Sequence, residues 1–197
     1  QDAILQNKDY LKLIDVIDIK YWYYKQDGST YAPEGGKFLA PRQHARQMDT
    51  GKETEAQTFR AVQEYRKKYP NKAIIYNTNA ASRMGWAVLM AGGSLPAIPK
   101  IEIEDFNKEV GLMQCNSAYS DLVWEMSRTG LTYLFYFKEN GSIELDLSTF
   151  KGNYEAYWID EKTGEILKEV LYKAGSSLHI SNDKTGSKVI YIHKVIK

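Results

Sequence analysis

The sequence predicts an α/β fold followed by an all-β fold, arranged as two domains, 1–130 and 131–197. From Ile14 to Ile98, apolar strand-like runs alternate with helical runs, an order typical of βαβ units with a parallel sheet. After Leu131 the pattern changes to short, closely spaced strands separated by turn signals. That spacing predicts a small antiparallel β-sandwich.

The composition indicates a globular protein without an excess of either charge. The chain has 197 residues, with Lys+Arg 26 against Asp+Glu 25, so it lacks the positive field that attracts nucleic acid or anionic membranes. No apolar run approaches the roughly 20 residues of a membrane-spanning helix. The single Cys115 excludes an intrachain disulfide and, in a context interpreted as helical, is expected to be a buried thiol.

Residue spacing argues against several kinds of site. The isolated pairs Gly35-Gly36 and Gly92-Gly93 lack the context of a phosphate-binding loop, and the nucleophile elbow of esterases is absent. His44, His179 and His193 lie too far apart in the sequence to form a metal-ligand motif. We therefore expect no cofactor and no metal, and interpret His179 and His193, in predicted strands, as structural or exposed.

The elements of the first domain are predicted from the spacing of apolar residues and from residues that end helices or form turns. A helix over 54–69 has Phe59 and Val62 on one side, and Pro70 closes it. The run 73–76 is fully apolar, as in parallel strands buried on both faces. The other predicted elements are helices over 3–13, 83–91, 105–111 and 118–128, strands over 16–24 and 94–98, turns at 26–29 and 33–36, and a helical turn over 42–46.

Turn signals organise the second domain. Gly130 is expected to end the helix over 118–128. Asn140-Gly141 is the strongest short hairpin signal and predicts a hairpin between strands over 133–137 and 143–147. We favour this turn over the glycosylation sequon that Asn140 also begins. Further strands are predicted over 154–160, 166–172, 178–180 and 189–193.

The stretch from Ile14 to Arg46 is the candidate ligand-facing element. Its strand runs into a loop that contains Gly and Pro and is rich in Tyr, Arg and His. In α/β enzymes the strand is a rigid scaffold, and the loop beyond its carboxyl end meets the ligand. A buried strand with an ordinary surface loop is the alternative. The candidate substrate-binding residues are Lys20, Tyr21, Trp22, Arg42 and His44, with Asn77 and Asn79 expected at the floor of the cleft.

Two chemistries are expected of these residues. Tyr21 and Trp22 offer apolar rings with polar handles, which suits stacking on a sugar ring. Arg42 and His44, with Arg46, form a cationic cluster that could donate to sugar hydroxyls or a uronate carboxylate. The alternative role of Arg42 is to tie the loop to the sheet.

Glycoside hydrolysis needs two carboxylates at one site, and Asp18 and Glu34 are the local candidates. Asp15 and Asp18 lie three apart on a strand, point to opposite faces and cannot form a dyad on one face. Asp18, between two isoleucines, is expected to be half-buried, where holding Arg42 or the loop is an equally good role. Glu34 could reach a ligand or remain solvated.

A resemblance to a known family is carried by the runs VIDIKYWYY, DGSTYAPEGGKFLAPRQHAR, KAIIYN and MGWAVLMAGGSLPAIP. Together they resemble the carboxyl half of a (β/α)8, or TIM, barrel in a bacterial family of glycoside-hydrolase-like proteins (apiosidase-like, DUF-type). The tail YLFYFKENGSIELDLSTFKGNYEAYWIDEKTGEIL is similar to the small β-sandwich named a collagen-binding-type domain. That name does not establish collagen binding.

The resemblance implies that residues 1 to about 130 supply a partial barrel, the last three or so βα units, within a longer protein. The chain begins at Gln1 without a Met and shows no signal peptide. Because three strands cannot close a barrel, we expect the missing half from another chain, or self-association. The resemblance also implies a glycan or polysaccharide ligand and a periplasmic or extracellular location.

One position departs from the family's pattern. Where the relatives' strand ends in a catalytic-type Glu, this chain has Thr78 between Asn77 and Asn79. Amides bind sugar hydroxyls but cannot act as nucleophile or general base. Whether the protein is an enzyme therefore stays open, and the isolated chain is expected to be inactive.

The alternative function is a non-catalytic carbohydrate- or matrix-binding module. Its aromatic candidates in the sandwich are Tyr154, Tyr157 and Trp158. Successive strand residues point to opposite faces, so at most one of Tyr157 and Trp158 belongs to the core. A third interpretation is that the sandwich only covers the barrel.

Overall fold

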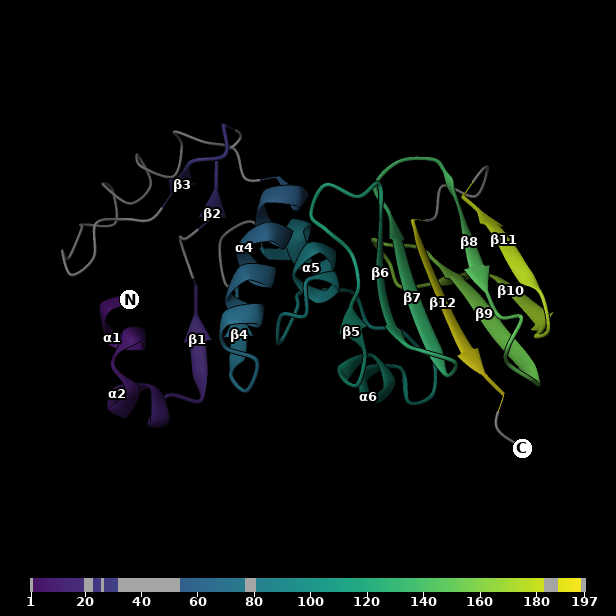
Figure 1. Cartoon of the computed structure of the whole chain (residues 1–197). Helices are drawn as coiled ribbons and strands as arrows, with labels where there is room; N and C mark the ends of the chain where they lie inside the picture. Colours follow the sequence, from purple (N-terminus) through teal and green to yellow (C-terminus); the bar gives the residue numbers. More distant parts are fainter. Residues whose placement is uncertain are drawn as a thin grey trace. The chain divides into compact units, whose positions relative to one another are not determined.

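The computed structural model describes residues 2–19, 23–25, 27–31, 54–76, 81–182 and 188–195. The chain divides into two compact units, Gln1–Ala97 and Ile98–Lys197. The first unit mixes helices with short strands, and the second consists mostly of antiparallel sheet (Figure 1).

Unit 1 contains the predicted strand–helix–strand order. Strand β1 (Val16–Asp18) pairs in parallel with β4 (Ala73–Ile75), and helix α4 (Glu55–Lys68) lies between them in the chain. Helix α5 (Ala81–Met90) follows, and Ser94 then forms a parallel bridge with Ile75. The predicted parallel βαβ pattern is therefore confirmed for this pair, while the described strands of the unit close no barrel.

Helix α4 begins and ends where its sequence predicts. The hydroxyl of Thr54 caps it by accepting a hydrogen bond from the Gln57 backbone at 3.3 Å. Phe59 and Val62 are fully buried on the apolar side of the helix, which contacts both α5 and β4. The last helical residue is Lys68, and Tyr69 caps the helix just ahead of Pro70, the predicted helix breaker.

Short elements complete unit 1. Helices α1 (Asp2–Gln6) and α2 (Lys8–Lys12) replace the single helix predicted over 3–13, because the side chain of Asn7 caps a new start by accepting from the Asp9 backbone at 2.9 Å. Strands β2 (Tyr23–Tyr24) and β3 (Thr30–Tyr31) pair antiparallel across the predicted turn, where Gly28 adopts a φ of 81°.

Unit 2 is built on a six-stranded sheet with the order β10-β9-β12-β7-β6-β5 and a two-stranded sheet, β11-β8. All the strand pairs in these two sheets are antiparallel. Helix α6 (Phe106–Gly111) precedes the first strand and packs its Phe106 ring edge-on against Tyr191 at 5.1 Å. The strands are β5 (Gln114–Cys115), β6 (Val123–Arg128), β7 (Thr132–Phe137), β8 (Ser142–Asp146), β9 (Asn153–Ile159), β10 (Ile166–Lys173), β11 (Ser177–Ser181) and β12 (Val189–Lys194).

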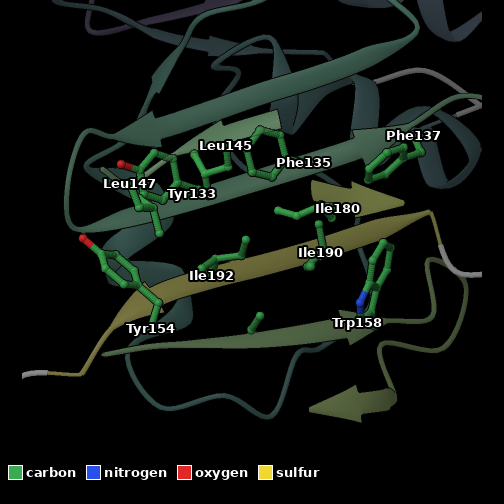
Figure 2. Packing of buried hydrophobic residues seen from close by; sticks show 11 residues of the cluster. Tyr133, Phe135, Phe137, Leu145, Leu147, Tyr154, Trp158, Ile180, Ile190 and Ile192 are labelled. Atoms are coloured by element: carbon green, nitrogen blue, oxygen red, sulfur yellow. The ribbon is translucent and has the colours of Figure 1, made fainter. Parts of the chain in front are cut away.

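An apolar layer lies between the two sheets (Figure 2). Phe135 and Phe137 of β7 and Trp158 of β9 contribute to it from the six-stranded sheet, and Leu145 of β8 and Ile180 of β11 from the other. These side chains occupy alternate strand positions and are almost completely buried. The predicted sandwich-like packing is therefore confirmed for this unit.

Three sequence expectations in unit 2 are wrong. Residues 118–128 do not form a helix, because 123–128 is strand β6, paired with β7. Cys115 accordingly lies in β5 and is only half-buried. The Asn140-Gly141 turn does not make a hairpin, since β7 pairs with β6 and β12 while β8 pairs with β11.

The predicted boundary near Gly130 falls within the six-stranded sheet. Gly130 lies in the turn between β6 and β7, and its φ of 78° suits a glycine. Its backbone N–H donates to the Tyr133 hydroxyl at 2.7 Å, and its carbonyl accepts from the Tyr154 hydroxyl at 2.8 Å. The sheet thus begins before the position at which the sequence pattern changes.

Candidate functional site

Of the predicted site residues, Asp18 alone falls within the described part of the chain. It is the last residue of β1 and faces residue Ile75 of β4 in the parallel register. The other predicted site residues lie outside the described residues: Lys20, Tyr21, Trp22, Glu34, Arg42, His44, Asn77 and Asn79.

The carboxyl ends of β1 and β4 lie at one edge of their sheet. Asp18 is in register with Ile75, and the Ile19 N–H extends the ladder by donating to the Ile75 carbonyl at 2.9 Å. The described chain then continues to Ile19 from one strand and to Tyr76 from the other. In parallel sheets, this edge is where loops meet ligands.

Asp18 is exposed, and the expectation that it is half-buried is wrong. Its neighbours Ile17 and Ile19 are buried, at 2% and 0% exposure, because alternate residues of the strand face the interior. An exposed carboxylate at this edge can meet a solvent-borne ligand.

A cluster that the sequence analysis missed joins β2 to helix α4. The Tyr24 hydroxyl donates to the Glu64 carboxylate, and the Arg60 guanidinium lies 3.5 Å from the centre of the Tyr24 ring. Burial raises the pKa of the Tyr24 phenol, and the hydrogen bond to Glu64 raises it further. Arg60 and Glu64 are four apart on α4, which places them on one helix face.

This cluster fixes strand β2, which lies within the candidate stretch. Tyr24 is two residues beyond Trp22 in the chain, and its side chain is buried. The buried phenol therefore ties β2 to α4. The Arg60–Glu64 spacing was the available signal, but nothing in the sequence identifies Tyr24 as its partner.

A second polar and aromatic group lies on the face of the six-stranded sheet opposite the sandwich core. The His193 ring stacks between those of Tyr157 and Tyr191, with centres 5.8 and 5.6 Å away. The Glu155 carboxylate accepts from the Tyr157 hydroxyl at 2.9 Å and lies 3.3 Å from His193 Nε2. Tyr191 is buried, whereas Tyr157, His193 and Glu155 are half-buried and reach solvent.

The three aromatic candidates of the alternative function lie on two different faces of the six-stranded sheet. Tyr154 and Trp158 belong to the core between the sheets, and Tyr157 points away from it. The prediction that at most one of Tyr157 and Trp158 is a core residue is confirmed. Tyr157 is thus the one candidate of the three that a ligand can reach.

The phenol of Tyr157 should make the stability of the protein depend on pH. Burial, and then the hydrogen bond to Glu155, raise the pKa of Tyr157 from 10.0 to about 12. A folded-state pKa above the unfolded value means that the stabilisation is complete below about pH 10 and is lost as the pH rises through about 12. We expect the urea midpoint of Tyr157→Phe to fall less than that of the wild type between about pH 9 and about pH 12. Parallel pH profiles for the two proteins would contradict the assignment.

The described residues hold no group of three or more His, Cys, Asp or Glu side chains that could bind a metal ion. His179 is exposed beside Glu144, with 2.6 Å between Nδ1 and Oε1. Among the helices in the described part of the chain, none has the length and apolar character needed to cross a membrane.

Comparison with known proteins identifies the family. No curated protein matches the chain. Residues 1–113 match the family described as "Domain of unknown function (DUF6298)", a match that covers unit 1 and continues through helix α6. Because this match spans more than half of the 197 residues, the chain belongs to the DUF6298 family.

Proposed function

We propose that this chain is part of a secreted bacterial glycoside-hydrolase-like protein that acts on or binds polysaccharide. In this proposal unit 1 contributes the last βα units of a partial (β/α)8 barrel, and the sandwich of unit 2 is its accessory domain. The observation that carries the proposal is the shared sheet edge at which β1 and β4 end, with Asp18 in register with Ile75.

The sequence just beyond this edge has the chemistry of a sugar site. Lys20, Tyr21 and Trp22 begin two residues after β1 ends, and Asn77 and Asn79 follow β4 at a similar interval. Aromatic rings stack on the apolar faces of sugars, while amides and cations bond to hydroxyls. Ile19 and Tyr76, the last described residues before these two runs, follow strand ends that lie at one sheet edge.

The candidate carboxylates of this site support glycan binding better than they support glycan hydrolysis. Hydrolysis needs an acid and a second carboxylate across the scissile bond, and Asp18 is an exposed member of any such pair, with Glu34 as the candidate partner. Thr78 stands where the resembling family carries a catalytic-type Glu. We therefore propose glycan binding at this edge, with catalysis dependent on carboxylates from elsewhere in the assembly.

The side of β1 that faces away from β4 is relevant to the partners of this chain. Among the described strands β1 pairs with β4 alone, and Val16 on it is 49% exposed. In the barrel proposal, further strands would pair with β1, contributed by another part of the protein or by another chain. Self-association through this edge is the remaining possibility.

The test uses the full gene product and a panel of polysaccharides and oligosaccharides. We expect Trp22→Ala and Arg42→Ala each to weaken binding by about tenfold or more, because a stacked ring or a charge-assisted hydrogen bond is lost. Tyr10→Ala is the matched control, since Tyr10 is an exposed aromatic residue on α2. Unchanged affinity in both variants would rule out this site.

A second candidate function rests on the group around Tyr157. Its half-exposed ring next to the Glu155 carboxylate is suited to holding a sugar or a matrix protein without catalysis. On this hypothesis Tyr157→Ala abolishes glycan or collagen binding that Trp22→Ala leaves intact. Tyr119→Ala, which removes another partly exposed tyrosine of unit 2, serves as control. Normal binding by Tyr157→Ala would exclude this function.

A further inference from the structure

Strand β10 forms one edge of the six-stranded sheet. Among the described strands it pairs with β9 alone. Leu171, near its carboxyl end, is 62% exposed, and Glu169 and Lys173 on either side of it are exposed as well. A large apolar side chain exposed on an edge strand favours association, because such edges template pairing with other strands.

The backbone of β10 has a definite outward set of hydrogen-bonding groups. The Ala174 N–H donates to the Gly152 carbonyl at 2.9 Å, and Tyr172 is in register with Tyr154, so even-numbered residues direct their backbone groups toward the β9 side. In an antiparallel strand the alternate residues direct theirs the other way. Glu169, Leu171 and Lys173 therefore present their N–H and C=O groups at the outer edge.

We propose that β10 pairs antiparallel with β10 of a second copy of this chain, about a two-fold axis at Leu171. This register places Leu171 opposite its own copy, and Glu169 opposite Lys173 of the second copy on both sides of the axis. Three residue pairs then exchange backbone hydrogen bonds, and all their side chains project from one face of the extended sheet. The result is a self-complementary interface of the kind that two-fold dimers use.

Other two-fold registers of the same edge are unfavourable. Centring the pair on Glu169 or on Lys173 would place identical charges directly opposite each other. Centring it on Val170 or Tyr172 would put a charged residue opposite Leu171. Like charges in direct cross-strand positions are destabilising, while opposite charges are stabilising. Among these five registers, only the one centred on Leu171 pairs both charges and the exposed leucine favourably.

The register shift between Ile166 and Lys168 limits the length of this contact. Irregularities of this kind end regular pairing at sheet edges. The regular outer edge is therefore the short segment 168–173, and the area that it can bury is smaller than that of a standard stable interface. We accordingly expect a weak, concentration-dependent dimer and not a permanent one.

Charge exchange provides the test, with sedimentation equilibrium of the 197-residue chain as the measurement. The wild type should dimerise reversibly. Glu169→Lys or Lys173→Glu alone should weaken dimerisation by about tenfold or more, since each creates like-charge pairs on both sides of the axis. The double variant, and an equimolar mixture of the two single variants, should recover the association of the wild type. A role of these residues in folding alone would not produce recovery on mixing.

Two further variants distinguish this interface from non-specific hydrophobic association. Leu171→Asp should abolish dimerisation, because two carboxylates would meet at the axis. Leu122→Asp is its matched control, since Leu122 is an equally exposed leucine of unit 2, at 63%, away from β10. A wild type that is monomeric at every accessible concentration would overturn the proposal. So would single charge variants that associate as the wild type does, or a mixture that fails to recover.

Discussion

Replacing Trp158 with Ala should lower the free energy of unfolding by about 3–5 kcal/mol, the range typical of a large aromatic residue removed from a core. Trp158 is 5% exposed and belongs to the layer between the two sheets of unit 2. Its ring lies 5.9 Å from that of Phe137 at a tilt of 33°. The loss arises because neighbours from two facing sheets cannot collapse into the space left behind. Urea unfolding followed by circular dichroism measures it.

The adjacent Tyr157 is the matched control for this substitution. It is half-exposed and points to the opposite face of β9. Tyr157→Ala loses a hydrogen bond to Glu155 and ring contact with His193, for an expected loss of about 1–2 kcal/mol. If Tyr157→Ala were the more damaging of the two, the assignment of faces on β9 would be wrong.

Gly164→Ala should be among the most damaging single-methyl additions in the described part of the chain. Gly164 adopts a φ of 80°, in the left-handed region that disfavours an L side chain by about 1–2 kcal/mol. A Cβ there would also lie 2.3 Å from the Lys100 carbonyl oxygen, so backbone must move on one side or the other. Together these effects predict a loss of about 2–4 kcal/mol.

Gly141→Ala is the control, because a Cβ at Gly141 meets nothing within 4 Å. Gly141 is also absent from the glycines with positive φ, in keeping with a connection between sheets in place of the tight hairpin turn that needs such a conformation. We expect its thermal midpoint to match that of the wild type within the small range typical of surface changes. A wild-type thermal midpoint for Gly164→Ala would contradict this prediction, because it would mean that the Lys100 backbone shifts at no cost in stability.

The sequence predicted elements with strong local signals. Helix α4 has its cap at Thr54 and its stop ahead of Pro70, as expected. The parallel pairing of β1 with β4 followed from the alternation of strands and helices. These features could be predicted because capping, periodicity and breakers act over a few residues.

The helix predicted over 118–128 is wrong because a short apolar run fits two periods. Leu122, Val123 and Met126 have helical spacing, yet Leu122 is exposed, and it is Trp124 and Met126, two apart, that are buried. A strand there supplies β7 with its second neighbour. Because every residue of β7 is buried, its backbone groups need partners on both sides.

The candidate site divides in the same way. The sequence correctly predicted the opposite orientations of Tyr157 and Trp158, since strand alternation is a local rule. The ligand-binding role of the stretch beyond β1 stays a prediction, because its candidate residues after Ile19 lie outside the described part of the chain. It did not identify the Tyr24–Glu64 hydrogen bond, whose partners lie 40 residues apart, or the contact between Glu155 and His193. Contacts of that kind depend on which segments fold against each other.

By itself, the sequence determined the βαβ order of unit 1, the strand-rich character of unit 2, the two ends of α4 and the turn between β2 and β3, because each of these follows from a few neighbouring residues. The tertiary structure alone decided that β7 and β8 belong to different sheets, that 123–128 is a strand, and that β10 is an edge with Leu171 exposed. Strand pairing is set by burial and backbone hydrogen bonding between distant segments, and local propensity carries no information about which distant segment will be the partner.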